Sequence, residues 1–407
     1  MLIESGKDLY LIPGLFDAHV HVGSVPRDAR RALAFLFVVN GVTFVRDMGG
    51  NTDVVLALRD GSSRGNRLSP EMIVTGTSLR GDDRKGQRVR SQVVCKTPDE
   101  GRRAVRKLVA KGVDQIKVHG GLAVEVYRAI SEEARANGLK VVGHVDDPVG
   151  LEEAVNMGQA SIEHVTPWLS LWNVSSAKKK KKWRRNHPGA SPLIWTIGGK
   201  QLRIDPEIWA DLMRKTRGSA ISACPTLIVF DRVGRLNDPR LKTDPLLDYV
   251  PASLRDHWNE TLQQWEREGK EEGVDLSLYA EVFPALLQLA KKLHDSGVSL
   301  VCGTDFAVPY LVAGFSLHEE MEFLQEAGLP PAAVLRAATL NAAKLCDVEQ
   351  RLGTVVEGKA ASLVLLRKNP LDNIRNTREI AGVFLNGEFY GRWFLDIHLE
   401  RVRARAR

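Results

Sequence analysis

Two histidines, His19 and His21, stand at the end of an apolar run that begins at Leu15. Side chains at positions i and i+2 of a β-strand point to the same face, so the two imidazoles are expected to project together. Imidazoles arranged in this way can share one metal ion. Because an isolated pair of this kind is common, the alternative is that both histidines are ordinary structural residues.

Further residues that can bind a metal or carry a proton follow later apolar runs. They are Lys117, His144, His164 and Asp305. Each one alone is explained as well by a hydrogen-bonded core or surface role. Their shared position at the ends of expected strands is more informative, because barrel enzymes place their chemistry at the carboxyl ends of their strands.

The elements that would position these residues are short β-rich runs that alternate with helical stretches. Strands are expected at Gly14–Val20, Thr43–Asp47, Met72–Thr75, Gln115–Val118, Val141–His144, Ser161–His164, Ile221–Pro225 and Ser299–Thr304. Most are continuous apolar runs, which is typical of strands buried on both faces of a parallel sheet. A capping box at Thr97-Pro98-Asp99-Glu100 predicts the start of one intervening helix, and Gly112 predicts its end.

This alternation predicts an α/β fold, specifically a (β/α)8 barrel over residues 13–351. A doubly wound open sheet is the alternative, but no glycine-rich dinucleotide fingerprint follows an early strand. After about Leu352, short apolar runs are joined by Gly and Asn turns, which indicates a separate β unit. We expect residues 1–12 and 352–407 to form a small β-sandwich domain, and a basic insertion near residues 166–204 to interrupt the barrel.

Several longer motifs carry a family resemblance. They are Pro13-Gly14-Leu15-Phe16-Asp17-Ala18-His19-Val20-His21, Asp114-Gln115-Ile116-Lys117, Ile162-Glu163-His164, Gly303-Thr304-Asp305 and Arg336-Ala337-Ala338-Thr339-Leu340-Asn341-Ala342-Ala343. With these motifs the chain resembles the amidohydrolase superfamily, in particular its imidazolonepropionase-like and prolidase-like members. The resemblance extends over nearly the whole chain.

The resemblance implies a centre of two divalent metal ions. Zinc is the expected metal, with manganese, cobalt and iron as alternatives. It assigns His19, His21 and Asp305 to one ion, His144 and His164 to the other, and Lys117 to both, as a carbamate formed with carbon dioxide. The carbamate is required because a lysine ammonium has no lone pair to offer a cation. An unmodified Lys117 would leave a site for one metal.

The implied reaction is hydrolysis of an amide or peptide-like C–N bond by a metal-bridged hydroxide. Asp305 would act as general base and then as general acid. A dipeptidase or an N-acyl amino-acid hydrolase is the expected activity, on a small-molecule substrate. Two alternatives stay open: a mononuclear deaminase or cyclic amidase like imidazolonepropionase, and a non-catalytic binding module that uses its basic segment.

Three residues near the expected strand ends are candidates for binding the substrate. His119 lies two residues beyond Lys117, whereas Arg46 and Arg80 end or follow the second and third strands. A guanidinium can grip a carboxylate through two parallel hydrogen bonds. The alternative for the arginines is a surface role, and for His119 a place in a loop.

Composition limits the class of protein and its partners. Among 407 residues, 43% are hydrophobic and 26% are charged, as in a globular chain. The net charge of +7 equals the charge of Lys178–Lys182 with Arg184 and Arg185, so nucleic-acid binding by the fold itself is not expected.

Location and assembly are less strongly indicated. No apolar run is long enough to span a membrane. The four cysteines form no CxxC pair, which fits a reducing compartment. We expect a cytoplasmic protein, although an incomplete N-terminus would leave a signal peptide open, and a homo-oligomer is compatible with the sequence.

Overall fold

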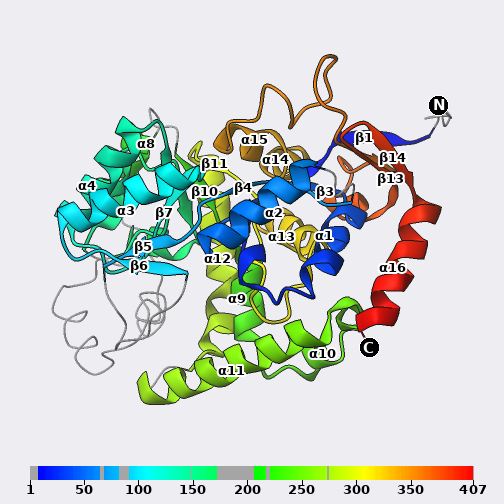
Figure 1. The fold of residues 1–407 in the computed structure, drawn as a ribbon, viewed down its shortest axis with the longest axis horizontal. Helices are drawn as coiled ribbons and strands as arrows, with labels where there is room; N and C mark the ends of the chain where they lie inside the picture. The colour runs from blue at the N-terminus through cyan, green and yellow to red at the C-terminus, as the bar shows by residue number, and fades with distance from the viewer. Residues whose placement is uncertain are drawn as a thin grey trace.

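The computed structural model describes residues 8–64, 68–81, 91–146, 148–171, 206–216, 221–272 and 275–406. Parallel strands occupy the interior and helices cover them, in an α/β arrangement (Figure 1). The basic run from Lys178 to Arg185 lies outside the described residues. Within the described part of the chain, no helix is both long and apolar enough to cross a membrane.

Eight predicted strands are confirmed. They are β2 (Leu15–Val20), β3 (Val42–Asp47), β4 (Glu71–Val74), β7 (Gln115–Val118), β8 (Lys140–Gly143), β9 (Ser161–Glu163), β10 (Ser222–Cys224) and β11 (Ser299–Leu300). The largest difference is at β11, which ends at Leu300 rather than Thr304. Most residues of these strands are buried, as continuous apolar runs predict for a sheet that is covered on both faces.

The parallel strands form two separate sheets and not a single closed ring. One has the order β2-β3-β4, and the other has the order β11-β10-β9-β8-β7-β5-β6. Backbone hydrogen bonds run between them: Ala18 N donates to Cys302 O (2.8 Å), and Asp114 N donates to Val74 O (2.9 Å). The carboxyl end of β2 is therefore held beside the segment after β11, and β4 beside the start of β7.

Two strands were not predicted, β5 (Ser78–Arg80) and β6 (Gln92–Val94). They pair in parallel with each other, and β5 also pairs with β7. We expected Arg80 to follow the third strand, but it is the last residue of a further strand, β5. The two strands flank a segment rich in Arg, Asp and Gly, which indicates a loop.

Helices connect and cover the strands. In chain order they are α1 (Arg30–Val39), α2 (Thr52–Arg64), α3 (Pro98–Lys111), α4 (Val124–Ala136), α5 (Gly150–Asn156), α8 (Pro206–Thr216), α9 (Leu227–Gly234), α10 (Pro239–Lys242), α11 (Ala252–Glu272), α12 (Leu278–Asp295), α13 (Phe315–Glu326), α14 (Pro331–Ala337) and α15 (Leu340–Leu345). The predicted capping box of α3 is confirmed, and Gly112 ends that helix in the left-handed conformation (φ 81°) that glycine adopts without strain.

The two chain ends meet in a small antiparallel sheet. Its order is β1 (Tyr10–Pro13), β12 (Leu363–Leu366), β13 (Ile380–Leu385) and β14 (Glu388–Gly391). The pairing of the N-terminal residues with this unit was expected, and Tyr10 indeed pairs with Leu366. The described residues form one sheet here, not the two sheets of a sandwich.

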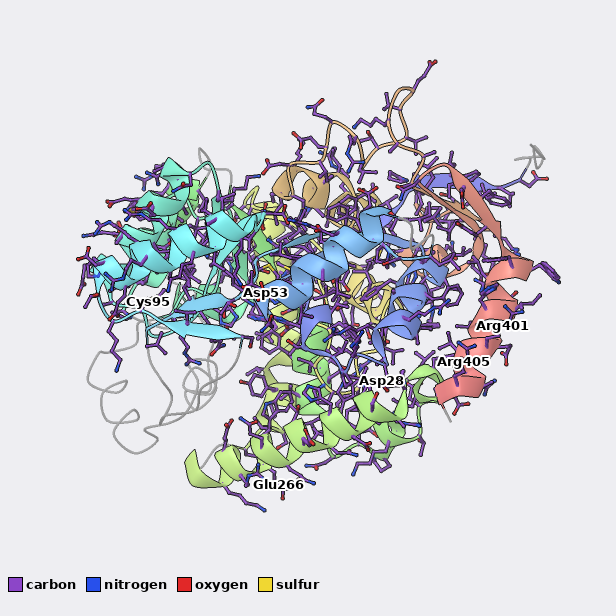
Figure 2. All side chains as sticks on the ribbon, in the orientation of Figure 1. Asp28, Asp53, Cys95, Glu266, Arg401 and Arg405 are labelled. Carbon is purple, nitrogen blue, oxygen red and sulfur yellow. The ribbon has the colours of Figure 1, made fainter. Side chains whose placement is uncertain are left out.

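The last element is a helix, α16 (Arg392–Ala406), which packs on the small sheet. The strands expected after Leu352 did not include this helix. Its Arg392 and Asp396 are ion-paired across one helical turn. Arg401 and Arg405 lie on α16, at the opposite end of the molecule from Cys95 (Figure 2). The arginines of this last helix therefore make only a local part of the surface basic.

Candidate metal and catalytic site

A cavity of about 210 Å³ opens where the carboxyl ends of several strands meet. The predicted residues that line it are His21, Lys117, His119, His144, His164 and Asp305. The other described lining residues are Ser24, Met48, Gly49, Ser78, Ser91 and Gln92. The structure thus brings together residues that are nearly 300 positions apart in the sequence, as their shared place at strand ends indicates.

Asp305 lies between the first two histidines. Its Oδ1 atom is 3.1 Å from His21 Nε2 and 3.3 Å from His19 Nε2. His19 is fully buried, and its Nε2 atom has no hydrogen-bond partner among the described residues. Buried polar atoms are rarely left without a partner, so an unpartnered imidazole nitrogen beside a carboxylate is suited to bind a cation. His164 completes a group whose ligand atoms lie within 4.8 Å of those of His19 and Asp305.

A second pair of histidines faces the same cavity. The Nε2 atoms of His144 and His164 are 3.2 Å apart. Burial lowers the pKa of both imidazoles, and the neighbouring His119 lowers that of His144 further. Neutral imidazoles whose ring nitrogens converge in this way are suited to a shared electrophile such as a divalent ion.

Lys117 is buried within β7 and lines the cavity. Burial lowers the pKa of its ammonium group, although the Asp305 and Glu163 carboxylates act in the opposite direction. Burial also opposes ionisation of Asp305, but His19 and His21 outweigh it and hold the pKa of Asp305 well below its ordinary value. The cavity therefore combines an ionised carboxylate with a lysine whose charge is disfavoured.

Three of the histidines are fixed by a second contact at Nδ1. The partner is Glu163 Oε2 for His19 (2.8 Å), Gly49 O for His21 (3.0 Å) and Thr226 Oγ1 for His164 (2.7 Å). Such contacts orient the ring and select its tautomer, leaving Nε2 free to bind a metal. The arrangement is the one that metal-ligating histidines normally show.

Glu163 is a functional candidate that our sequence interpretation missed. Besides His19, its carboxylate accepts from Arg46 Nη2 at 2.8 Å and from the Ser161 hydroxyl. Burial opposes its ionisation, but Arg46 and His19 outweigh burial and hold the pKa of Glu163 far below the ordinary value. The Ile162-Glu163-His164 motif contained the necessary signal, a glutamate directly before a strand-end histidine.

The prediction that Arg46 binds substrate is corrected by its position. Arg46 is fully buried, and its donors reach Ala18 O at 2.6 Å, Ser161 Oγ at 2.9 Å and Glu163. Because none of these contacts lies on the cavity wall, Arg46 supports Glu163 from behind instead of meeting a ligand.

The strand that carries His19 is locked to the Asp305 segment by Asp17. Its Oδ1 accepts from Thr304 N at 2.9 Å, and its Oδ2 accepts from the Thr304 hydroxyl at 2.7 Å. Burial raises the pKa of Asp17 to about 7 against these hydrogen bonds. At Gly303 the two segments lie so close together that a Cβ atom on this residue would be 2.8 Å from the backbone nitrogen and the Cβ of His19. The two motifs are thus one packed unit.

Backbone strain is concentrated in the same place. His164, Thr226 and Asp305 have φ angles of 65°, 49° and 59°. Non-glycine residues rarely adopt this left-handed region, and such residues cluster at functional sites. At His164 the turn ends the regular alternation of β9, so Glu163 and His164 can both approach His19.

Of the other two predicted substrate contacts, His119 follows β7 and Arg80 ends the neighbouring strand β5, and only His119 of the two lines the cavity. The His119 ring packs on that of His144, with centroids 4.1 Å apart. Arg80 is 95% buried and donates through Nη1 to Gln92 Oε1. Arginine has only donors, so the amide oxygen of Gln92 must face Arg80. Gln92 itself lines the cavity. Gln92 was not predicted.

Comparison with known proteins agrees with this arrangement. The model of the amidohydrolase family matches residues 10–170 and 282–389. The chain belongs to the amidohydrolase family. It is therefore a hydrolase that acts on carbon–nitrogen bonds, as the resemblance implied. The family is typically metal-dependent, and the described cluster supplies candidate ligands for a metal ion.

Individual relatives are distant but extend over most of the chain. Ochratoxinase from Aspergillus niger is 24% identical over 91% of this amidohydrolase and 72% of its own length. Bottromycin amidohydrolase has a similar structure, with a TM-score of 0.70 and 25% identity over 98% of this chain and 81% of its own. A Xaa-Pro dipeptidase has a TM-score of 0.66 at 23% identity, over 96% and 91% of the two chains. The last likeness shows the fold alone.

Proposed function

We propose that this amidohydrolase cleaves the amide bond of a small peptide-like or N-acyl amino-acid substrate at a binuclear metal centre. The observation that carries the proposal is the convergence of histidine Nε2 atoms on Asp305, with a buried His19 Nε2 that lacks a partner among the described residues. The similarity to a protein named as a bottromycin amidohydrolase supports an amide substrate.

The donor set fits two ions. His19, His21 and Asp305 would hold one, His144 and His164 the other, and a carbamate on Lys117 would join them. Imidazole and carboxylate ligands suit zinc, and also manganese, cobalt or iron. When bound, such ions make water more acidic and polarise a carbonyl group.

The residues of the chain would perform the proton transfers. The Asp305 carboxylate is exposed to the cavity and close to two histidines, where it can take a proton from the attacking water and later deliver it to the leaving nitrogen. His119 and Gln92, which both line the cavity, would contact the substrate. Arg80 would act through Gln92, which its guanidinium orients.

We also propose that the two parallel sheets form one (β/α)8 barrel over residues 13–351. The backbone hydrogen bonds of Ala18 with Cys302 and of Asp114 with Val74 support this closure. Residues 1–12 and 352–407 would form the small domain, for which a second sheet stays a prediction, as does the basic insertion near residues 166–204. A cytoplasmic location and a homo-oligomeric state remain predictions as well.

The test combines metal analysis with a substrate panel. The purified protein, loaded with zinc or manganese, is expected to contain two metal ions per chain and carbon dioxide bound at Lys117. Dipeptides and N-acyl amino acids are assayed together with cyclic amides and amino-substituted heterocycles. One metal per chain with an unmodified Lys117 would contradict the binuclear centre and favour a mononuclear deaminase or cyclic amidase. No turnover of any compound by metal-loaded protein would favour a binding module.

A further inference from the structure

We propose that Arg232 on α9 is a positioning residue for catalysis, because it anchors the loop that carries Asp305. The proposal rests on the proposed role of Asp305. Arg232 lies between residues 171 and 281, the part of the chain that the family model does not match. Its role therefore follows from the contacts of this chain and not from membership of the family.

The Asp305 loop is short and has two strained residues, Asp305 with φ 59° and Tyr310 with φ 65°. At its start, Asp305 N donates to His19 O at 2.7 Å. Within it, Val308 N donates to Asp305 O at 3.2 Å and Leu311 N to Val308 O at 3.1 Å. A loop in this conformation persists only when surrounding contacts determine it.

Two of these contacts come from the unmatched segment. Trp258 Nε1 on α11 donates to Ala307 O at 3.1 Å, and Arg232 Nε on α9 donates to Tyr310 O at 3.3 Å. Both side chains are buried. The loop is thus held at two carbonyl groups by residues outside the strands that provide the metal-ligating candidates.

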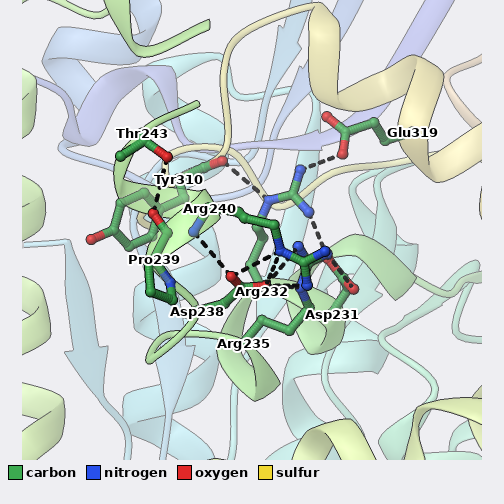
Figure 3. Close-up of polar contacts among 9 residues, drawn as sticks. All are labelled: Asp231, Arg232, Arg235, Asp238, Pro239, Arg240, Thr243, Tyr310 and Glu319. Carbon is green, nitrogen blue, oxygen red and sulfur yellow. Dashed lines mark hydrogen bonds and ion pairs between the residues drawn. The ribbon is translucent and has the colours of Figure 1, made fainter. Parts of the chain in front are cut away.

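Arg232 can act as an anchor because each of its nitrogens has a different partner. Besides Tyr310 O, Nη1 donates to Asp231 Oδ2 at 2.6 Å, and Nη2 is ion-paired with Glu319 on α13 (Figure 3). The guanidinium is planar and rigid, so it fixes α9, the Asp305 loop and α13 relative to one another. A lysine has no second and third nitrogen with which to do so.

The rest of the cluster is more exposed and offers a control. Arg235 pairs with Asp231 and Asp238, and among the described residues Arg240 has an ion pair with Asp238 only. The Arg240 side chain is 82% exposed, whereas that of Arg232 is 6% exposed. In Figure 3, Arg240 belongs to the same network but has no dashed contact with Tyr310.

Helix α9 also reaches the other half of the site. Thr226, directly before it, holds His164 Nδ1 at 2.7 Å, and the Phe230 ring lies edge-on to His164 with centroids 6.4 Å apart. One helix therefore contacts both a candidate metal ligand and the loop of the candidate proton carrier. A shift of α9 would change the distance between these two groups.

The experiment compares Arg232→Lys and Arg232→Met with Arg240→Met in metal-loaded protein. Both Arg232 variants are expected to lose about tenfold to a hundredfold in kcat, the size of effect that a small misplacement of a reacting group produces, with KM changed less than about twofold. Arg240→Met should keep the parent kcat and KM. Metal content and thermal midpoint are measured for every variant, so that a loss of folding is recognised.

Hydrogen exchange provides a readout that does not depend on turnover. Exchange at the amides of Val308 and Leu311 should be at least about tenfold faster in Arg232→Lys than in the parent or in Arg240→Met, because local opening of the loop becomes easier. Parent-like exchange and kcat in a folded Arg232→Lys protein would overturn the proposal, as would equal losses in the Arg232 and Arg240 variants. Faster exchange in a protein that is inactive on the whole panel would refute the proposed function and leave the anchor intact.

Discussion

The two sides of the cavity are built in different ways. The histidine side consists of His21, Lys117, His144, His164 and Asp305, which lie on buried strands or follow them, with the buried His19 beside Asp305. The glutamine side consists of Ser78, Ser91 and Gln92, on or next to the short strands β5 and β6. The first side can perform chemistry, whereas the second offers only hydrogen bonds. The difference indicates that turnover and substrate recognition can be altered separately.

The largest effect is expected from Asp305→Asn on the histidine side. The amide keeps the shape of the side chain but cannot take up the proton of the attacking water, so kcat should fall by about 10²–10⁴. Metal content should be largely retained, which elemental analysis of the purified variant checks. Asp28→Asn is the control, because Asp28 is exposed at the surface (Figure 2). Parent-like turnover of Asp305→Asn would remove Asp305 from the mechanism.

A smaller effect on the same side is expected from Glu163→Gln. Neutralising this residue weakens the contact that orients His19 and leaves Arg46 buried without its ion pair. Loss of such an orienting contact typically lowers metal affinity by about 10–100-fold, which competition with a chelator would measure. Glu153→Gln breaks only an exposed pair with Arg128 and should change neither affinity nor stability. Unchanged metal affinity in Glu163→Gln would mean that His19 is oriented without it.

The same division separates what the sequence could and could not predict. Eight strands were predictable because strands that are buried on both faces are mostly apolar. The histidine side followed from them, since its residues end those strands. The glutamine side did not, because β5 and β6 flank a segment rich in Arg, Asp and Gly that indicates a loop, and the polar residues on them are ordinary in type.

Arg46 shows the limit for a charged residue. A strand-end arginine is compatible with gripping a substrate, and only the position of Glu163, more than a hundred residues later, shows that the guanidinium is already paired. The role of Arg232 could likewise not be predicted, because it depends on contacts with three partners from three elements. Such contacts are set by tertiary packing and leave no local pattern.

The glutamine side is tested by Gln92→Leu. Removing one hydrogen-bond donor should raise KM by about three- to tenfold while kcat changes little, because a single hydrogen bond contributes about 1 kcal/mol. The comparison requires steady-state kinetics on the best substrate of the panel. Ser24→Ala, on the same cavity but away from β5 and β6, is the control. A fall in kcat comparable to that of Asp305→Asn would show that the two sides cannot be separated.

The last effect, on stability rather than on turnover, concerns two buried glutamates that differ in their partners. Glu163 is paired with Arg46, whereas Glu320 on α13 accepts only from backbone nitrogens, and its Oε1 has no partner among the described residues. Burial raises the pKa of Glu320 from 4.5 to about 8. The folded protein therefore keeps a proton there that the unfolded chain releases. The resulting contribution to stability is fully present below about pH 4.5 and is lost as the pH rises to about 8.

Glu320→Gln removes this titration while keeping the shape of the side chain. The free energy of unfolding of the parent should fall relative to that of the variant between pH 5 and pH 8, by at most about 1.4 kcal/mol per pH unit. Urea denaturation at several pH values measures the difference, and groups that titrate equally in both proteins cancel from it. Parallel curves for parent and variant would show that Glu320 is already ionised in the folded protein. The Arg46 partner of Glu163 would then not explain a difference between the two glutamates.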